Sequence, residues 1–181
     1  MSRIGSIASA QPKGIILREK DLPASEYKSL AEAVLEICHK YNTPCILHSF
    51  ADTAIELGAA ALHLPLPILR ELPTNKKSRF TTLGASCHSP EEAIEAESLG
   101  CTYITAGHVF DTDCKKGLPG RGLEFLKQVC DSVTVPVYGI GGIGRENAAQ
   151  AINAGAKGVC VMSGAMTCSN PQEYLAGFKE I

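Results

Sequence analysis

One short pattern recurs three times along this chain of 181 residues, and it constrains the fold more than any other feature. In each copy an amphipathic segment ends at a glycine, and an apolar run begins directly after it; the glycines are Gly58, Gly100 and Gly155. Glycine at the end of a helix can adopt the left-handed backbone that stops the helix. Helices that alternate in this way with buried strands predict βαβ units and a parallel sheet, and therefore an α/β protein.

The apolar runs predict seven strands with helices between most of them. The strands are expected at Gly14–Leu17, Pro44–Leu47, Ala61–Leu64, Thr81–Ala85, Tyr103–Ala106, Val135–Gly139 and Gly158–Met162. The helices are expected at Ser25–Tyr41, Ala51–Leu57, Ser89–Leu99, Leu123–Cys130 and Glu146–Ala154. The clearest helix start is the third, because Ser89 can cap it and Pro90 suits the first helical position.

Both a doubly wound sheet and a (β/α)₈ barrel fit this alternation. No glycine-rich phosphate loop follows the first strand, as a dinucleotide-binding fold would require. Glycine and polar residues instead follow many strands at their carboxyl ends, where barrels build their sites. We therefore predict a single domain, residues 1–181, of the TIM (β/α)₈ type. Seven visible strands are one fewer than a complete barrel has.

Composition excludes several other classes of protein. The net charge of −2 gives no general attraction to nucleic acid or to anionic membranes. No apolar run reaches the roughly 18 residues of a membrane span, and the residues at 1–10 lack a signal-peptide pattern. The eight cysteines show neither C-x-x-C nor zinc-finger spacing, so we expect reduced thiols and no metal. These features predict a cytoplasmic protein that binds neither nucleic acid nor membranes.

Two glycine-containing loops follow the last two predicted strands. The first contains Gly141 and Gly142, and the second contains Met162, Ser163 and Gly164. Backbone amides in such loops, next to helix N-termini, suit a phosphate dianion, and barrels often place phosphate after their final strands. The alternative is that these glycines serve only tight turns between strand and helix.

The richest segment is the long polar loop from 106 to 122. It contains His108, Thr112, Asp113, Cys114 and Lys115. His108 can titrate near neutral pH and transfer protons in both directions, although a purely structural histidine is an equal alternative. Basic neighbours lower the pKa of a thiol such as Cys114, but no second histidine pairs with it, which disfavours covalent catalysis.

Three further side chains at strand ends are candidates for the same site. Arg18 and Lys20 share one side of an extended segment, so together they can hold a carboxylate or phosphate. Charges at a strand end are more often simply solvated. Ser86 is expected to line the pocket, whereas the neighbouring His88 is expected to organise the helix start at Ser89, and His48 and His63 to bond to backbone.

These motifs together resemble the thiamine phosphate synthase/TenI superfamily over most of the chain, from about residue 14 onward. The matching segments are Arg18–Lys20, Gly84–His88, Gly107–Lys115, Ile140–Ile143 and Gly155–Ser163. The loop of the synthases reads G-P-x-F-x-T-x-T-K; here His108 replaces its proline and Cys114 its second threonine, as in the TenI branch.

The resemblance to the TenI branch implies a thiazole tautomerase of thiamin biosynthesis. Such an enzyme aromatises a carboxylated thiazole phosphate that carries an exocyclic double bond, and it needs no cofactor. His108 would transfer the proton. The substrate, a small thiazole phosphate, would be held by Arg18, Lys20, Ser86, Thr112, Asp113, Cys114, Lys115, Gly141, Gly142, Met162, Ser163 and Gly164.

Other residues depart from the synthase pattern. The synthases end two neighbouring strands in carboxylates that hold magnesium, but the matching positions here are His48-Ser49 and a segment after His63 that contains no acid. Ile16 replaces a glutamine beside the pyrophosphate-binding arginine. The alternatives that remain are a thiamine phosphate synthase and a non-catalytic regulatory or ligand-binding protein.

The resemblance also bears on the missing strand. It begins where the first helix of the family ends, so residues 1–10 are expected to be helical and the first strand absent. Two strand edges would then be unpaired. A start downstream of the native one, a rearrangement, or a partner chain as in a homodimer would each account for this.

Overall fold

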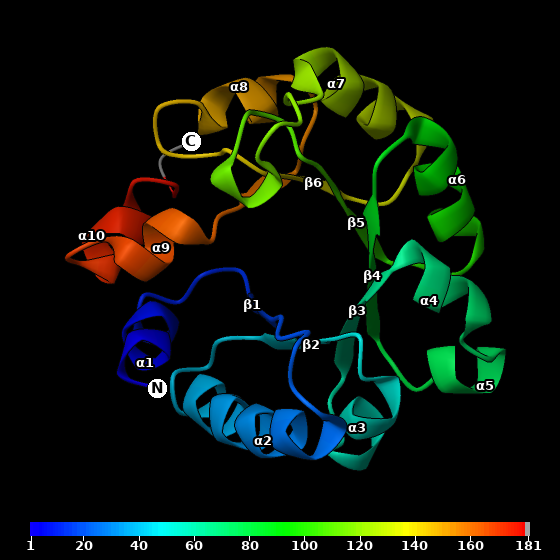
Figure 1. Ribbon diagram of the computed structural model, residues 1–181, viewed down its shortest axis with the longest axis vertical. Coiled ribbons are helices and arrows are strands. Elements are labelled where there is room, and N and C mark those ends of the chain that lie inside the picture. The colour runs from blue at the N-terminus through cyan, green and yellow to red at the C-terminus, as the bar shows by residue number, and fades with distance from the viewer. Residues whose placement is uncertain (180–181) are drawn as a thin grey trace.

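The computed structural model describes residues 1–179, and its seven strands form one sheet in which each strand pairs in parallel with the next along the chain. The strands are β1 (Ile15–Leu17), β2 (Cys45–His48), β3 (Ala61–Pro65), β4 (Thr82–Cys87), β5 (Tyr103–Gly107), β6 (Val137–Ile140) and β7 (Gly158–Cys160). The sheet curls, and the helices lie around its outer face (Figure 1). The prediction of a barrel-type α/β fold with seven strands is confirmed, with strand ends displaced by one or two residues.

The helices include all those expected from the sequence and several short ones that were not. They are α1 (Ser2–Ser9), α2 (Ala24–Lys40), α3 (Ala51–Glu56), α4 (Leu66–Glu71), α5 (Thr74–Lys77), α6 (Pro90–Ser98), α7 (Gly122–Ser132), α8 (Ala148–Asn153), α9 (Ser163–Thr167) and α10 (Pro171–Ala176), with one 3₁₀ turn, η1 (Asp113–Lys115). Pro67 lies in the first turn of α4 and Pro73 caps α5, because proline is tolerated where no helical N–H bond is needed. No helix in the described residues is long and apolar enough to cross a membrane.

The helix-to-strand joints form as the sequence predicts. Gly58, Gly100 and Gly155 have φ of 66°, 95° and 105°, which is the left-handed region that stops each helix. The Oγ of Ser89 accepts a hydrogen bond from the backbone N–H of Glu92 at 3.2 Å and so caps α6. These local signals set the positions at which strands begin.

Alternate residues of each strand face opposite sides of the sheet, which separates an apolar core from a polar interior. Leu47, Leu62 and Ile104 are fully buried in the core cluster, which includes residues of both the sheet and the helices. The Oη of Tyr27 on α2 donates to the carbonyl of Leu17 at 3.1 Å and accepts from the backbone N–H of His48 at 3.0 Å. The packed helix side therefore fixes the strand ends that carry the candidate site.

The sheet is open between its first and last strands. Within residues 1–179, β1 and β7 are not paired with each other, and α1 rather than a strand precedes β1, as expected. Helices meet on this side instead: α1 packs on α10, where Gln172 Nε2 donates to Ser9 Oγ at 3.1 Å (Figure 1). Lys179 Nζ adds a bond to the carbonyl of Ala10 at 3.1 Å. The two sides of the opening are thus joined by helix contacts rather than by a strand ladder.

Candidate functional site

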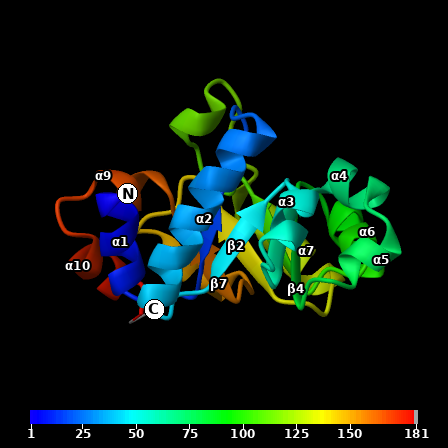
Figure 2. The ribbon, with the colours of Figure 1, turned by 90° about the horizontal axis from the view of Figure 1, so that it is seen from below.

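The candidate residues gather at the carboxyl ends of the parallel strands. The loop between β5 and α7, with η1 at its tip, rises above the body of the molecule at this end, on the side where α2 begins (Figure 2). Ligands of parallel α/β proteins bind at this edge because the connecting loops and helix N-termini meet there.

His108 begins this loop on a well-held backbone. Its carbonyl accepts the N–H of Arg121 at 3.0 Å, and the next N–H, that of Val109, donates to the carbonyl of Ile140 at 2.9 Å. The His108 Nε2 lies 3.2 Å from the carbonyl oxygen of Leu118. Because a carbonyl only accepts, Nε2 carries the proton, and Nδ1 of the neutral ring is left as the proton acceptor. This arrangement suits a group that takes up and returns a proton.

The two glycines of the β6–α8 loop have a packing role that the structure explains directly. Gly141 and Gly142 have φ of 98° and 64°. A Cβ on Gly141 would collide with His108, and one on Gly142 would collide with the carbonyl oxygen of Asp111. Glycine is therefore needed here for the close approach of the His108 loop, and phosphate binding stays a prediction.

Substituting Gly142 with alanine is expected to destabilise the protein more than the same change at Gly58. Both residues have nearly the same positive φ, 64° and 66°, but a Cβ at Gly58 would meet nothing within 4 Å. The left-handed backbone costs about 1–2 kcal/mol in each variant, and the collision with Asp111 adds roughly 1–3 kcal/mol of overpacking. Urea unfolding of both variants measures the difference; equal losses of unfolding free energy would contradict the packing role.

A hydrogen-bonded cluster lies inside the curled sheet, on strands β3, β4 and β5. His63 Nδ1 is 2.8 Å from Tyr103 Oη, and its Nε2 is 2.9 Å from Ser86 Oγ. Thr105 Oγ1 is 3.4 Å from both His63 Nε2 and Ser86 Oγ. The expectation that His63 bonds to backbone is wrong, because the inward-facing positions of three strands bring side chains to both of its ring nitrogens. This network fixes the position of the Ser86 hydroxyl.

Aromatic rings continue the cluster across the sheet. The rings of His48 and His63 stack with centroids 5.7 Å apart, His63 lies 5.4 Å from Tyr103, and Tyr103 meets Tyr138 edge-on at 5.9 Å. His48 Nδ1 lies 2.7 Å from the hydroxyl of Ser49, so it too bonds to a side chain rather than to backbone. The interior is therefore a row of rings from β2 to β6.

Both interior histidines are held in the neutral form. Burial, together with the smaller effects of the charges of Arg18 and Lys20, lowers the pKa of His48 to about 4. Burial also lowers the pKa of His63 to about 3, with smaller effects of His48 and Arg18. Arg18 and Lys20 are thus near this cluster while their own side chains are exposed. Two cationic side chains therefore act on the two neutral histidines at the ends of β2 and β3.

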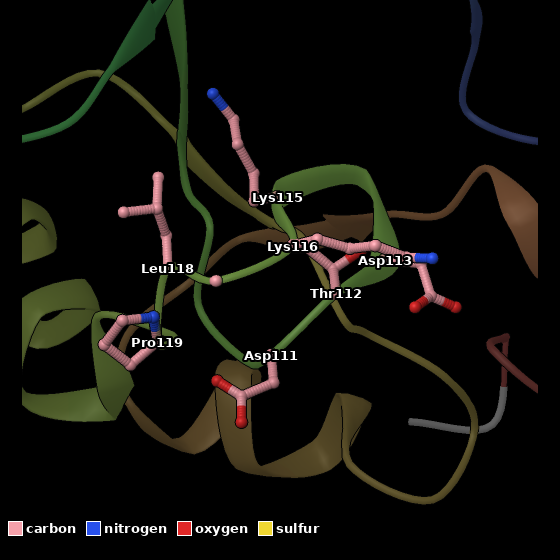
Figure 3. Close-up of a pocket in the computed structure, with 8 residues that line it drawn as sticks. Asp111, Thr112, Asp113, Lys115, Lys116, Leu118 and Pro119 are labelled. Atoms are coloured by element: carbon pink, nitrogen blue, oxygen red, sulfur yellow. The ribbon is translucent and has the colours of Figure 1, made fainter.

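The long loop forms a hollow of its own. An open depression of about 490 Å³ is lined by Asp111, Thr112, Asp113 and Lys115 through Pro119. Figure 3 shows Lys115 pointing away from Asp111 in this hollow. Neither His108 nor Arg18 lines it, so the structure does not bring all predicted substrate contacts into one cavity.

The remaining predicted contacts lie at the start of α9 and beside the loop. Met162 and Ser163 are exposed, and a Cβ on Gly164 would collide with the hydroxyl of Tyr174. Cys114 is an exposed free thiol, one of eight free cysteines. The second glycine loop therefore has a packing reason for its glycine, as the first does.

One residue beside the glycine loop, Asn147, was missed by the sequence, and one residue that was noted, His88, makes a contact that was not expected. Asn147 donates from Nδ2 to the carbonyl of Gly142 and accepts the N–H of Gly144 at its Oδ1, both at 2.9 Å, and so shapes the glycine loop. His88 takes part in the start of α6, as expected, through its backbone N–H, and its side chain also reaches across to β5. An asparagine just before a helix is a usual turn signal; nothing local to His88 indicates its cross-strand contact.

Known proteins similar to this chain in sequence include several thiamine-phosphate synthases. A family model described as thiamine monophosphate synthase matches residues 1–165. A thiamine-phosphate synthase of Ruminiclostridium cellulolyticum is 38% identical over 152 residues, which cover 81% of this chain and 70% of the relative. One from Pyrococcus horikoshii is 31% identical and covers 98% of this chain and 87% of its own length.

Solved structures agree with these sequence relatives. A thiamine phosphate pyrophosphorylase from Pyrococcus furiosus superposes with a TM-score of 0.84 at 25% identity, covering 99% of this chain and 87% of the other. A 3-hexulose-6-phosphate synthase superposes with a TM-score of 0.74 over 99% of this chain and 91% of the other, but at 17% identity it shows the shared fold alone.

Proposed function

The chain belongs to the thiamine monophosphate synthase family, and within this family we propose that it is an isomerase of thiamine biosynthesis, which aromatises a carboxylated thiazole phosphate. The second candidate is the synthase reaction itself, which joins the thiazole phosphate to a pyrimidine diphosphate. The names of the matched relatives fit this second candidate better than the first. The residues at the ends of β2 and β3 favour the first.

The observation that carries the proposal is the chemistry at the ends of β2 and β3. The synthase pattern places carboxylates there to hold magnesium, whereas the matching positions here are His48-Ser49 and a segment after His63 that contains no acid. Both histidines are neutral, and the charge of Arg18 acts on both. Magnesium binds oxygen ligands, carboxylates above all. Within residues 1–179, no group of three or more acidic, histidine or cysteine side chains is placed to hold a metal ion. The donor set does not fit magnesium, so no step is assigned to a metal.

Isomerisation needs one proton removed from a ring carbon and one delivered to the exocyclic carbon. His108 can perform both transfers, because its Nε2–H faces the Leu118 carbonyl and Nδ1 is available as a base. The proton that Nδ1 takes up returns to the substrate at the second carbon, so the enzyme ends unchanged. The aromatic product supplies the driving force.

Binding is assigned to the side chains and loop amides that the sequence predicts. Amides near Gly142 and at Ser163 and Gly164 would bind the phosphate, while Arg18 and Lys20 would bind the carboxylate. Thr112 to Lys115, on the raised loop, would close over the ring. A non-catalytic ligand-binding protein would use the same cationic groups and is distinguished by turnover.

Two assays on one preparation are expected to separate the candidates. The carboxylated thiazole phosphate with the exocyclic double bond should be converted without added metal, seen as rising absorbance of the aromatic thiazole. A pyrimidine diphosphate with the aromatic thiazole phosphate and magnesium should give no thiamine phosphate. The opposite pair of results would establish the synthase and reject the isomerase. Binding without turnover in either assay would indicate the non-catalytic protein.

A further inference from the structure

One side-chain hydrogen bond joins β4 to the residue just before His108. The Nδ1 of His88 lies 2.7 Å from the carbonyl oxygen of Gly107. Since a carbonyl only accepts, His88 Nδ1 carries the proton and donates it. We propose that His88 is a positioning residue, which holds the Gly107 carbonyl and thereby sets where the His108 imidazole lies. Its catalytic consequence rests on the function proposed above; its structural part does not.

His88 is itself held firmly enough to act as an anchor. Its backbone N–H donates to Glu92 Oε2 at 2.6 Å, and the N–H of Glu92 in turn donates to Ser89 Oγ at 3.2 Å. This reciprocal arrangement is close to a capping box, which fixes the entry of the chain into a helix. Cys87, the preceding residue, pairs with Ala106 in the sheet. The His88 backbone is thus fixed on one side by β4 and on the other by α6.

The opposite side of the Gly107–Val109 segment is held by β6. Gly107 pairs with Ile140, and a Cβ on Gly107 would collide with the Ile140 carbonyl oxygen. The same oxygen accepts the N–H of Val109 at 2.9 Å. His108 therefore lies between a backbone contact to β6 and a side-chain contact to β4. Substitution can remove only the second of these, and that makes the role of His88 testable.

Loss of the His88 bond would leave the Gly107 carbonyl to water and release one side of this segment. A displacement of about 1 Å at a catalytic group can lower the rate on the order of a hundredfold. Substrate binding depends on the cations and loop amides instead, so it should change little. The expected signature is a fall in kcat with a nearly constant KM.

Three substitutions separate positioning from general damage. His88→Ala is expected to lower kcat of the isomerisation on the order of ten- to a hundredfold. His88→Asn should restore most of it, because the asparagine amide can donate from the place of Nδ1. His88→Gln, whose amide corresponds to Nε2, should not. His39→Ala, on the exposed end of α2, is the matched control and should leave kcat unchanged.

A second readout needs no substrate. In proton NMR of the full chain, the ring signal of His108, identified by its loss in His108→Gln, should shift in His88→Ala and return toward its native position in His88→Asn. An unchanged His108 signal in folded His88→Ala, or equal kcat in His88→Asn and His88→Gln, would overturn the proposal. A shifted signal in a protein without isomerase activity would reject the proposed function and leave the positioning role standing.

Discussion

Replacing His108 with glutamine is expected to abolish isomerisation while leaving the protein folded and able to bind phosphate ligands. The glutamine amide can still donate to the Leu118 carbonyl, as Nε2 does at 3.2 Å in the native protein. It has no basic nitrogen that takes up and returns a proton. A positioned acid–base group contributes about 10²–10⁴-fold to a rate, so kcat should fall by about that factor. Product absorbance measures the rate, and calorimetry with the aromatic thiazole phosphate measures binding.

The outcome of this substitution is informative in either direction. Unchanged unfolding free energy and ligand affinity, with the rate lost, would assign the proton transfer to His108. Full activity of His108→Gln would remove that assignment. Loss of binding together with activity would instead indicate that the imidazole itself holds the ligand.

Acidification from pH 6.5 to 5 is expected to destabilise the protein steeply. The pKa values of His48 and His63 are lowered by burial to about 4 and about 3, whereas an unfolded histidine titrates near 6.5. Between these values the unfolded chain binds more protons than the folded one, so unfolding becomes more favourable as pH falls. The free energy of unfolding is therefore highest above pH 6.5, as far as these two histidines are concerned, and it declines as the pH falls toward their folded-state pKa values. Each histidine contributes a slope of up to ~1.4 kcal/mol per pH unit.

Urea unfolding at several pH values in this window measures the slope. His48→Asn should reduce it by the share of one histidine, because asparagine takes up no proton in either state. His39→Gln removes an exposed histidine and should leave the slope unchanged. Restricting the measurement to pH 5 and above keeps the protonation of carboxyl groups from dominating the slope. A slope that His48→Asn leaves unaltered would mean that the interior ring is not held neutral.

The architecture was readable from the sequence because its signals are local. Glycines such as Gly58 and Gly100 stop helices by backbone geometry, and Ser89 caps α6 through an N–H three residues away. The short helices α4 and α5 could not be predicted, since Pro67 interrupts an apolar run and Pro73 precedes a polar segment in the sequence, yet each lies at the start of a helix in the structure. A proline that interrupts a segment and a proline that begins a helix look the same in the sequence, and only the packing of the chain distinguishes the two cases.

The site was only partly readable, because its contacts cross between strands. The position of His108 in a polar, glycine-rich loop indicated chemistry. The bonds of His63 to Tyr103 and Ser86 depend on the register of three strands, which single segments do not encode. For the glycine loop, the sequence suggested a phosphate site, whereas the structure explains Gly142 by the approach of Asp111, which lies 31 positions earlier in the chain.

The strand order bears on how this chain reaches its fold. Every strand pairs with its immediate neighbour along the chain, and β1 does not pair with β7. Each strand pairing therefore closes one helix-containing connection, and such non-local parallel pairing forms more slowly than a local hairpin does. The contact of α1 with α10, which joins segments about as far apart as the chain allows, forms on helices outside the sheet. Because the sheet is open, the two ends of the chain meet through helices, and this contact is separate from the pairing of the strands.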